Sequence, residues 1–383
     1  MYDGRSAAMG GAGQAYIEGM GAAFHNPANL DGIGRFGFTL HAQPTFVRPE
    51  GPLYTPNQEE KGERAIAPMI LGGVGGHLHD RVAVGGAFFI RGGAGARYKG
   101  GALDGDDLEF ALYVMEMTVP ISIKLTDQLK VGIAPRMIYV IEQGDTQRPL
   151  TAASPPAATD PRMSFEMSGL SKLPGLAIGV QYQPLPKLRF GATYRSVIKA
   201  DLDGDLDVSL GDLKFEAPTG AVWRTPHSVH LGAAYQVHPS VLLVADFDVR
   251  LFEKVNKGQT IDVSELEIQP PDGPPRFVLN WQNVYQGRIG VEGWLNDVFA
   301  LRGGYHVGNS ATPASAANAL SVPPGMIHVV TAGVGLRVKS AALDLAGSYA
   351  IIGADVDQSI SGPPGRYTGQ AGSVGLAARY DLR

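Results

Sequence analysis

The sequence predicts an all-β protein: a 14-stranded antiparallel transmembrane β-barrel with an N-terminal hatch, or plug, inside its lumen. Three observations lead to this fold class. Most of the chain shows strand-like alternation, its connections alternate in length, and it opens with a segment of small residues. The 383 residues include 51 glycines and 27 prolines, too many for a helical protein.

Residues 1–33 form the predicted hatch. The stretch "GRSAAMGGAGQAYIEGMGAAFHNPANL" is dominated by glycine and alanine, which bury little apolar area and cannot build a core of their own. A barrel of this size has a lumen too wide for its wall side chains alone to fill. We therefore expect the segment to lie inside a barrel formed by residues 34–383.

From Gly34 onward, apolar and polar residues alternate with a period of two, which is typical of strands with one apolar and one polar face. In "SVGLAARYDL", for example, Val374 and Leu376 share one face, whereas Arg379 and Asp381 share the other. The expected strands span residues 34–47, 67–79, 81–98, 108–125, 129–143, 165–183, 187–209, 215–237, 240–256, 276–295, 298–308, 326–338, 340–353 and 368–382.

The connections between these strands are alternately short and long. The short turns lie at residues 79–80, 126–128, 184–187, 238–240, 296–297 and 339–340. The long connections, rich in proline, glycine and aspartate, lie at 48–66, 99–107, 144–164, 257–275, 309–325 and 354–367, with 210–214 the weakest of the set. Outer-membrane barrels show this alternation and an even strand number. A soluble β-sandwich or propeller is the alternative, but its strands are usually only about 5–6 residues long.

Composition excludes several other classes of protein. A net charge of −5, with 18% charged residues, gives no basic surface for nucleic acid. Cysteine is absent, and no apolar run is long enough for a transmembrane helix. The chain carries no HExxH, P-loop or GxSxG motif, so we expect no enzymatic activity and no cofactor. His77 and His79 lie beside Asp80 at a tight turn without a third ligand, so we expect no metal site.

The N-terminal stretch resembles the hatch of the FadL/TodX family of outer-membrane transporters, and its most specific part is the step Asn26, Pro27 and Ala28. The similarity continues through residues 226–249 and 296–313 and into the last strand. The resemblance implies a 14-stranded, hatch-plugged barrel in the bacterial outer membrane that takes up long-chain fatty acids or aromatic hydrocarbons. It also implies release by hatch movement, through a lateral opening at an inward kink in the third strand.

The two ends of the chain depart from what the resemblance implies. The sequence starts "MYDGRS" without a signal peptide, so we expect a mature or trimmed form of an exported protein. The family usually ends in a phenylalanine used in membrane assembly, whereas this chain ends in Arg383. The assembly signal is therefore unassigned, while the expected fold is unaffected.

The third expected strand, "VAVGGAFFIRGGAGARY", is interrupted by Gly92, Gly93 and Gly95. Glycine permits a bulge or kink there, and we take these residues as the kink site. The alternative is that these glycines mark no kink and only reflect the high glycine content of the strands, because glycine is equally common in the preceding strand at residues 72–76.

Apolar and basic lumen residues are the candidates for ligand binding. On the fourth expected strand, Leu108, Phe110, Leu112 and Val114 face the lumen and suit a chain-like ligand; packing against the hatch is the equal alternative. Most charged lumen residues should pair with one another. They are Arg136, Arg195, Arg250, Arg288, Arg302, Arg337, Glu116, Asp246, Asp248, Glu292 and Asp344.

Three of these arginines are also candidates for a ligand carboxylate, because the guanidinium group fits carboxylate geometry. They are Arg136, Arg288 and Arg302. Arg302 could equally pair with Asp246 or Asp248.

These observations predict an outer-membrane protein that takes up hydrophobic compounds passively through an apolar pocket. Its expected partners are a hydrophobic small molecule (fatty acid, detergent or hydrocarbon) and outer-membrane lipid or lipopolysaccharide, and we expect a monomer that binds no nucleic acid. A rival hypothesis is a scaffold for protein secretion or surface attachment, which the proline-rich stretches 152–161 and 269–275 would suit. A plain porin is a third hypothesis and predicts ion conductance, which a hatch should suppress.

Overall fold

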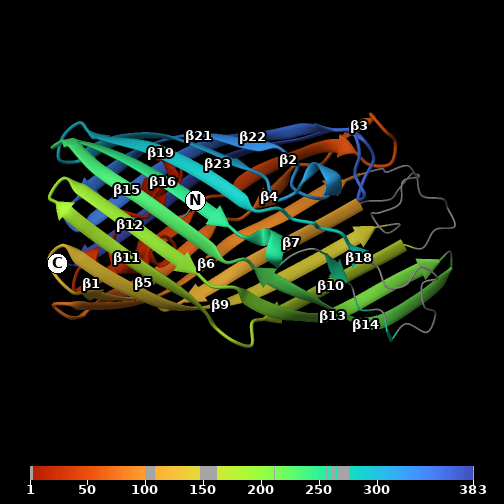
Figure 1. The fold of residues 1–383 in the computed structure, drawn as a ribbon, viewed down its shortest axis with the longest axis horizontal. Helices are drawn as coiled ribbons and strands as arrows, with labels where there is room; N and C mark the ends of the chain where they lie inside the picture. The colour runs from red at the N-terminus through yellow and green to blue at the C-terminus, as the bar shows by residue number, and fades with distance from the viewer. Residues whose placement is uncertain are drawn as a thin grey trace.

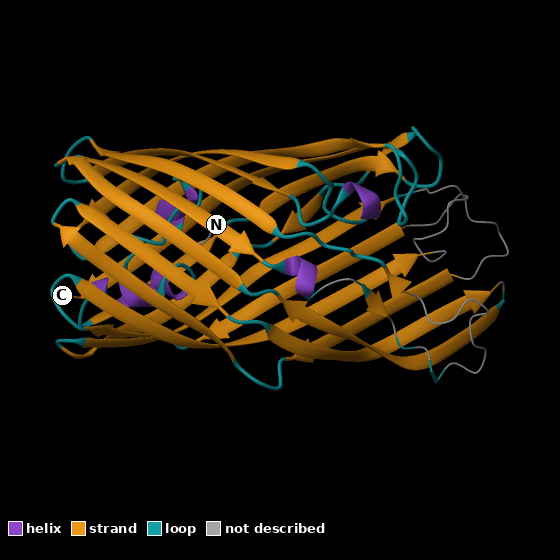
Figure 2. Ribbon diagram, viewed as in Figure 1, coloured by secondary structure: helices purple, strands orange, loops and turns teal. Residues whose placement is uncertain are grey.

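The computed structural model describes residues 3–99, 108–146, 162–210, 212–255, 258–260, 262, 264–265 and 276–382. It confirms the predicted class, a closed antiparallel barrel of fourteen strands. The barrel closes because β1 (Phe36–Ala42) pairs with β23 (Gly365–Leu382) along its whole length. The short turns gather at the end where the C-terminus lies, and the long connections at the opposite end (Figure 1; Figure 2).

Six of the expected strands are divided into shorter elements, so the main sheet contains 21 strands in all. Proline lacks an N–H to donate to the ladder, and prolines stand in five of the interruptions, at positions 44, 68, 120, 174 and 226. The divided strands are β1 with β2 (Thr45–Pro52), β3 (Glu59–Lys61) with β4 (Ala65–Ala67) and β5 (Ile70–His79), β7 (Leu108–Thr118) with β8 (Ile121–Lys124), β10 (Arg162–Leu170) with β11 (Gly175–Leu185), β12 (Leu188–Arg195) with β13 (Ile198–Leu210), and β14 (Leu213–Thr225) with β15 (Ser228–His238).

The remaining wall strands are continuous. They are β6 (Val82–Tyr98), β9 (Leu129–Thr146), β16 (Val241–Arg250), β19 (Val284–Trp294), β20 (Phe299–Asn309), β21 (Met326–Val338), β22 (Ala341–Val356) and β23.

Three predicted boundaries are wrong. The connection expected at 48–66 contains the end of β2 and the whole of β3. The strand expected at 240–256 ends at Arg250 and is followed by the 3₁₀ turn η3 (Phe252–Lys254). The strand expected at 276–295 begins only at Val284. Residues 276–277 instead form β18 (Arg276–Phe277), which pairs with β17 (Gln259–Thr260) in a separate small sheet. The proline-rich stretches 152–161 and 269–275 lie outside the described residues.

The outward face changes character along the chain, and this change marks the edge of the membrane. On β11 the outward side chains are apolar and exposed, among them Ile178 and Val180. On β13, in contrast, they include a row of aspartates: Asp201, Asp203, Asp205 and Asp207. Charged residues on the lipid face are destabilising near the bilayer midplane and cost little near the interface, so a row of four aspartates indicates that this part of the hairpin extends beyond the hydrocarbon.

Residues 3–33 lie inside the barrel, near the end with the short turns (Figure 1). They form α1 (Gly4–Ala7), η1 (Gly19–Ala23) and η2 (Pro27–Gly32). The Asp3 side chain caps α1 by accepting from the backbone N–H groups of Arg5 and Ser6, and the Asn26 side chain caps η2 at Ala28. Among the described residues, no helix is long and apolar enough to cross a membrane.

Wall glycines make room for this segment. A Cβ atom at Gly132 would lie 2.3 Å from the Ala28 nitrogen, and one at Gly191 would lie 2.1 Å from the Gln14 oxygen. A Cβ atom at Gly304 would lie 2.2 Å from the Gly10 nitrogen. Because real Cβ contacts with backbone are never this short, the segment can pack here only against glycine.

Candidate functional site

A cavity of about 630 Å³ lies in the lumen, bounded on one side by the N-terminal segment. Gln14, Phe24 and His25 contribute that boundary. The walls supply aromatic and aliphatic side chains together with a limited set of charged groups. Such a combination of apolar surface and few polar groups is typical of small-molecule sites.

Four of the predicted ligand residues line this cavity: Phe110, Leu112, Val114 and Arg288. The other three do not. Leu108 packs in a separate apolar cluster with Tyr98 and Leu320, while Arg136 and Arg302 are buried in ion pairs. All seven remain predictions as ligand contacts.

Three arginines converge on Glu116 of β7, which is completely buried. Arg136 donates to both Glu116 oxygens, at 2.7 and 2.9 Å, and Arg91 donates at 2.8 Å. Arg195 lies 3.3 Å from the same carboxylate and also donates to the Phe24 carbonyl oxygen in the N-terminal segment. This ion cluster therefore connects the barrel wall to the segment.

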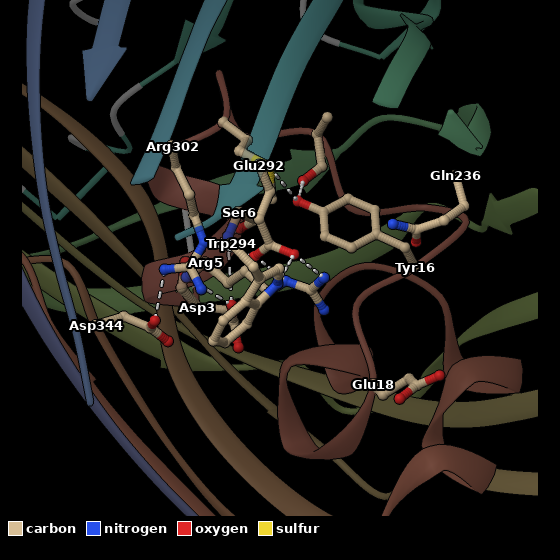
Figure 3. A network of polar contacts seen from close by, with 12 residues as sticks. Asp3, Arg5, Ser6, Tyr16, Glu18, Gln236, Glu292, Trp294, Arg302 and Asp344 are labelled. Carbon is tan, nitrogen blue, oxygen red and sulfur yellow. Dashed lines mark hydrogen bonds and ion pairs between the residues drawn. The ribbon is translucent and has the colours of Figure 1, made fainter. Parts of the chain in front are cut away.

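A second network joins the start of the chain to the opposite wall (Figure 3). Arg5 donates to both oxygens of Glu292, at 2.6 and 2.8 Å. Arg302 bridges Glu292 at 2.7 Å and Asp344 at 2.6 Å. Burial acts to lower the pKa of Arg5, but the Glu292 carboxylate opposes this effect and holds the pKa above its ordinary value.

The pairing considered for Arg302 with Asp246 or Asp248 is wrong, because both aspartates are engaged elsewhere. Asp246 accepts from the backbone N–H groups of Gly13 at 2.6 Å and Gln14 at 3.1 Å, and so holds the N-terminal segment directly. Asp248 pairs with Arg288, and His230 lies 2.8 Å from its carboxylate. Cross-strand register decides this outcome, since Arg302 stands opposite Glu292.

The wall is interrupted between the second and third strands of the barrel. The β5–β6 ladder ends at the pair Leu71–Phe89, and the β6–β7 register shifts between Ile90 and Gly92. Cavity-lining residues lie on both sides of this interruption: Ala67, Met69, Arg91, Gly92, Gly93 and Ala94. The shift falls at the glycine run singled out in the sequence; its role as a kink and exit stays a prediction.

Sequence reasoning missed part of the cavity. Trp223, Trp281 and Gln259 line it, as does Glu142 of β9. A signal for Glu142 was present, because it is the next inward-facing residue after Arg136, Ile138 and Val140 on the same strand. The tryptophans and Gln259 reach the cavity only through the tertiary fold.

At the tight turn, the His77 ring lies within hydrogen-bond distance of two backbone carbonyl oxygens. The ring of His77 lies 3.0 Å from the Asp31 carbonyl oxygen of the N-terminal segment and 3.1 Å from that of His79. In the part of the chain that the structure describes, no group of three or more acidic, histidine or cysteine side chains could hold a metal ion.

The fold and cavity together define a class of protein, a barrel of the outer membrane whose lumen holds an internal segment and a ligand-sized cavity. Residues 2–381 match the family model described as outer membrane protein transport protein (OMPP1/FadL/TodX). The chain therefore belongs to the FadL/TodX family and is an outer-membrane transporter of hydrophobic compounds. This family consists of transport channels rather than enzymes.

Solved structures have the same fold at low sequence identity. A Pseudomonas aeruginosa FadL homologue has a TM-score of 0.82 at 16% identity, covering 100% of this chain and 98% of that one. A deletion mutant of TodX, a monoaromatic hydrocarbon channel, has a TM-score of 0.81 at 17% identity, with 100% and 99% coverage. The Ralstonia pickettii toluene transporter TbuX has a TM-score of 0.75 at 20% identity, with 100% and 98% coverage. No curated protein sequence gives a significant match.

Proposed function

We propose that the protein takes up apolar molecules by passive diffusion through the cavity, followed by movement of the hatch and exit through the barrel wall. One observation carries this proposal. A single cavity is lined by the hatch residues Phe24 and His25 and by both edges of the wall interruption, at Met69 and Gly92. A molecule in the cavity would thus contact both parts that release requires.

Apolar partitioning supplies the driving force. Phe110, Leu112 and Val114 present a hydrocarbon wall, and burial of apolar ligand surface there is worth about 25 cal/mol per Å². No energy source is needed, because the ligand leaves down its own concentration gradient.

The substrate classes we propose are long-chain fatty acids and hydrocarbons. The cavity lining carries more arginines than carboxylates, which favours a ligand with an acidic head on the basic side. The arginines are Arg91, Arg195, Arg224, Arg250 and Arg288, and the carboxylates are Glu142 and Asp248.

Release would require the hatch, residues 1–33, to break polar contacts with the barrel wall. They include the bonds from Gly13 and Gln14 to Asp246, the bond from Arg195 to the Phe24 carbonyl, and the ion pair between Arg5 and Glu292. We propose that the protein acts as a monomer, because the cavity and the wall interruption both lie within one chain. No observation on the described residues favours the secretion-scaffold alternative.

The substitution Gly92→Phe tests the exit route. A Cβ atom at Gly92 meets no heavy atom within 4 Å, so a ring there would fill the interruption without displacing the wall. We expect uptake to fall at least about tenfold, equivalent to a barrier raised by about 1.4 kcal/mol. The assay is uptake of radiolabelled oleate and toluene by Gram-negative cells that lack their own transporter.

The matched control is Gly86→Phe, which lies on the same strand, also has open space, and faces outward. This variant should transport normally. Wild-type uptake by Gly92→Phe would rule out the lateral exit, and native mass spectrometry of the purified protein would identify any ligand retained in the cavity.

A further inference from the structure

Glu142 differs from three other buried carboxylates of the lumen, Glu116, Asp248 and Glu292. Glu142 is completely buried, as Glu116 is. Whereas Glu116, Asp248 and Glu292 each pair with at least one arginine, Glu142 has no cation within ion-pair distance among the described residues. A buried carboxylate without a cation is costly unless it takes up a proton or accepts hydrogen bonds.

The described residues provide a hydrogen-bond donor for only one of the two carboxylate oxygens of Glu142. Gln259 Nε2 donates to Glu142 Oε2 at 2.8 Å, while Oε1 is buried and has no hydrogen-bond partner in the described residues. A carboxylate has about four acceptor sites when it is ionised, and a buried acceptor left without a donor is destabilising. Because Glu142 lines the cavity, a ligand could supply the missing donor.

The surrounding wall is apolar and aromatic. Phe110 and Leu112 line the cavity with Trp223 and Trp281, whose rings meet edge to face with centroids 5.5 Å apart. The indole Nε1 of Trp223 is a second buried polar atom without a partner in the described chain. This lining therefore contains an acceptor and a donor that the described residues leave unsatisfied.

The charge of the lining decides what kind of donor fits. Five arginines line the cavity, and they remain in excess over its two carboxylates and Glu116, with which Arg91 and Arg195 pair, so a cationic ligand would be repelled. A neutral hydroxyl group is not repelled by the arginines. It donates to an ionised carboxylate in a short, charge-assisted hydrogen bond of about 2.5–2.7 Å. Poor access of water strengthens such a bond.

We propose that Glu142 accepts a hydrogen bond from the hydroxyl group of an apolar ligand, so that the protein selects alcohols over hydrocarbons of the same shape. This inference rests on the proposed function, because it concerns the cavity that transports the ligand. It assigns Glu142 as a specificity-determining residue.

The test compares two ligands that differ only in a hydroxyl and a methyl group, 2-cyclohexylethanol and propylcyclohexane. Neither absorbs in the near ultraviolet, so each can be titrated by tryptophan fluorescence of the detergent-purified full chain, in which two of three tryptophans line the cavity. We expect the affinity ratio, alcohol over hydrocarbon, to fall about tenfold from wild type to Glu142→Leu. Partition of the ligands into detergent cancels in this comparison.

Two further variants make the result specific. Asp145→Asn removes a carboxylate from the same strand; Asp145 pairs with Arg162 and does not line the cavity, so the ratio should stay at the wild-type value. Glu142→Gln keeps the side-chain volume and an acceptor but removes the charge, and we expect an intermediate ratio. This variant decides the question if Glu142→Leu does not fold.

An equal ratio in wild type and the Glu142 variants would overturn the inference, while hydrocarbon binding in all of them would leave the proposed function standing. Failure of the wild type to bind either ligand would overturn the proposed function itself.

Discussion

At Glu116 one carboxylate forms ion pairs with three guanidinium groups in a completely buried site. The sequence indicated that lumen arginines and carboxylates should pair, and the structure shows ion pairs for most of them. The sequence could not show which arginine pairs with which carboxylate. Arg136 and Arg91 stand on the strands on either side of Glu116, whereas Arg195 comes from β12. Arg195 lies two strands beyond the strand that carries Arg136, and the curvature of the barrel wall brings its side chain to Glu116.

Glu116→Gln should destabilise the protein strongly, because it leaves three buried arginines without their counter-charge. Breaking a buried pair in this way costs about 3–5 kcal/mol. We expect a clearly lower temperature for loss of the folded, heat-modifiable band on gel electrophoresis. Glu166→Gln, which changes an exposed carboxylate of β10, serves as the control and should leave that temperature unchanged.

At the scale of elements, the wall and the N-terminal segment are fitted to each other. Glycine in the middle of a strand weakens it, so inward-facing glycines on several strands need an explanation. They form the contact surface for the backbone of residues 9–28, as the close approaches at Gly132, Gly191 and Gly304 show. The sequence displayed these glycines without revealing which of them face inward onto the segment.

Gly304→Val should displace the N-terminal segment, because the added Cβ would meet the backbone at Met9 and Gly10 rather than a flexible side chain. In planar lipid bilayers we expect the wild type to conduct ions weakly and the variant to conduct at least about tenfold better as the lumen opens. Gly287→Val is outward-facing with open space and should behave as wild type. Equal conductance in all three proteins would show that the segment does not restrict the lumen.

At the scale of the whole molecule, the outward face determines how the barrel sits in the membrane. Leu231 on β15 is 48% exposed and belongs to the apolar belt, whereas Asp205 on β13 belongs to the acidic row beyond it. Long loops of outer-membrane barrels face outward from the cell, which places the β13–β14 hairpin outside.

Cysteine labelling of whole cells checks this orientation, since the chain contains no cysteine of its own. Asp205→Cys should react with a membrane-impermeant maleimide, and Leu231→Cys should stay unlabelled until the protein is dissolved in detergent. Labelling of Leu231→Cys but not of Asp205→Cys in intact cells would contradict the orientation.

The sequence by itself determined the all-β class, the strand number and the alternation of short and long connections. These properties depend on a period of two and on local turn chemistry, which neighbouring residues carry. It also placed Phe110, Leu112 and Val114 on one face of one strand. Only the tertiary structure decided that Arg302 pairs with Glu292 and Asp344, and that Glu142 and Gln259 meet in one cavity. Arg302 and Glu292 meet across one hairpin, but Asp344 lies on a further strand, and Glu142 and Gln259 are more than a hundred residues apart, so these networks are complete only once the barrel has formed around residues 3–33.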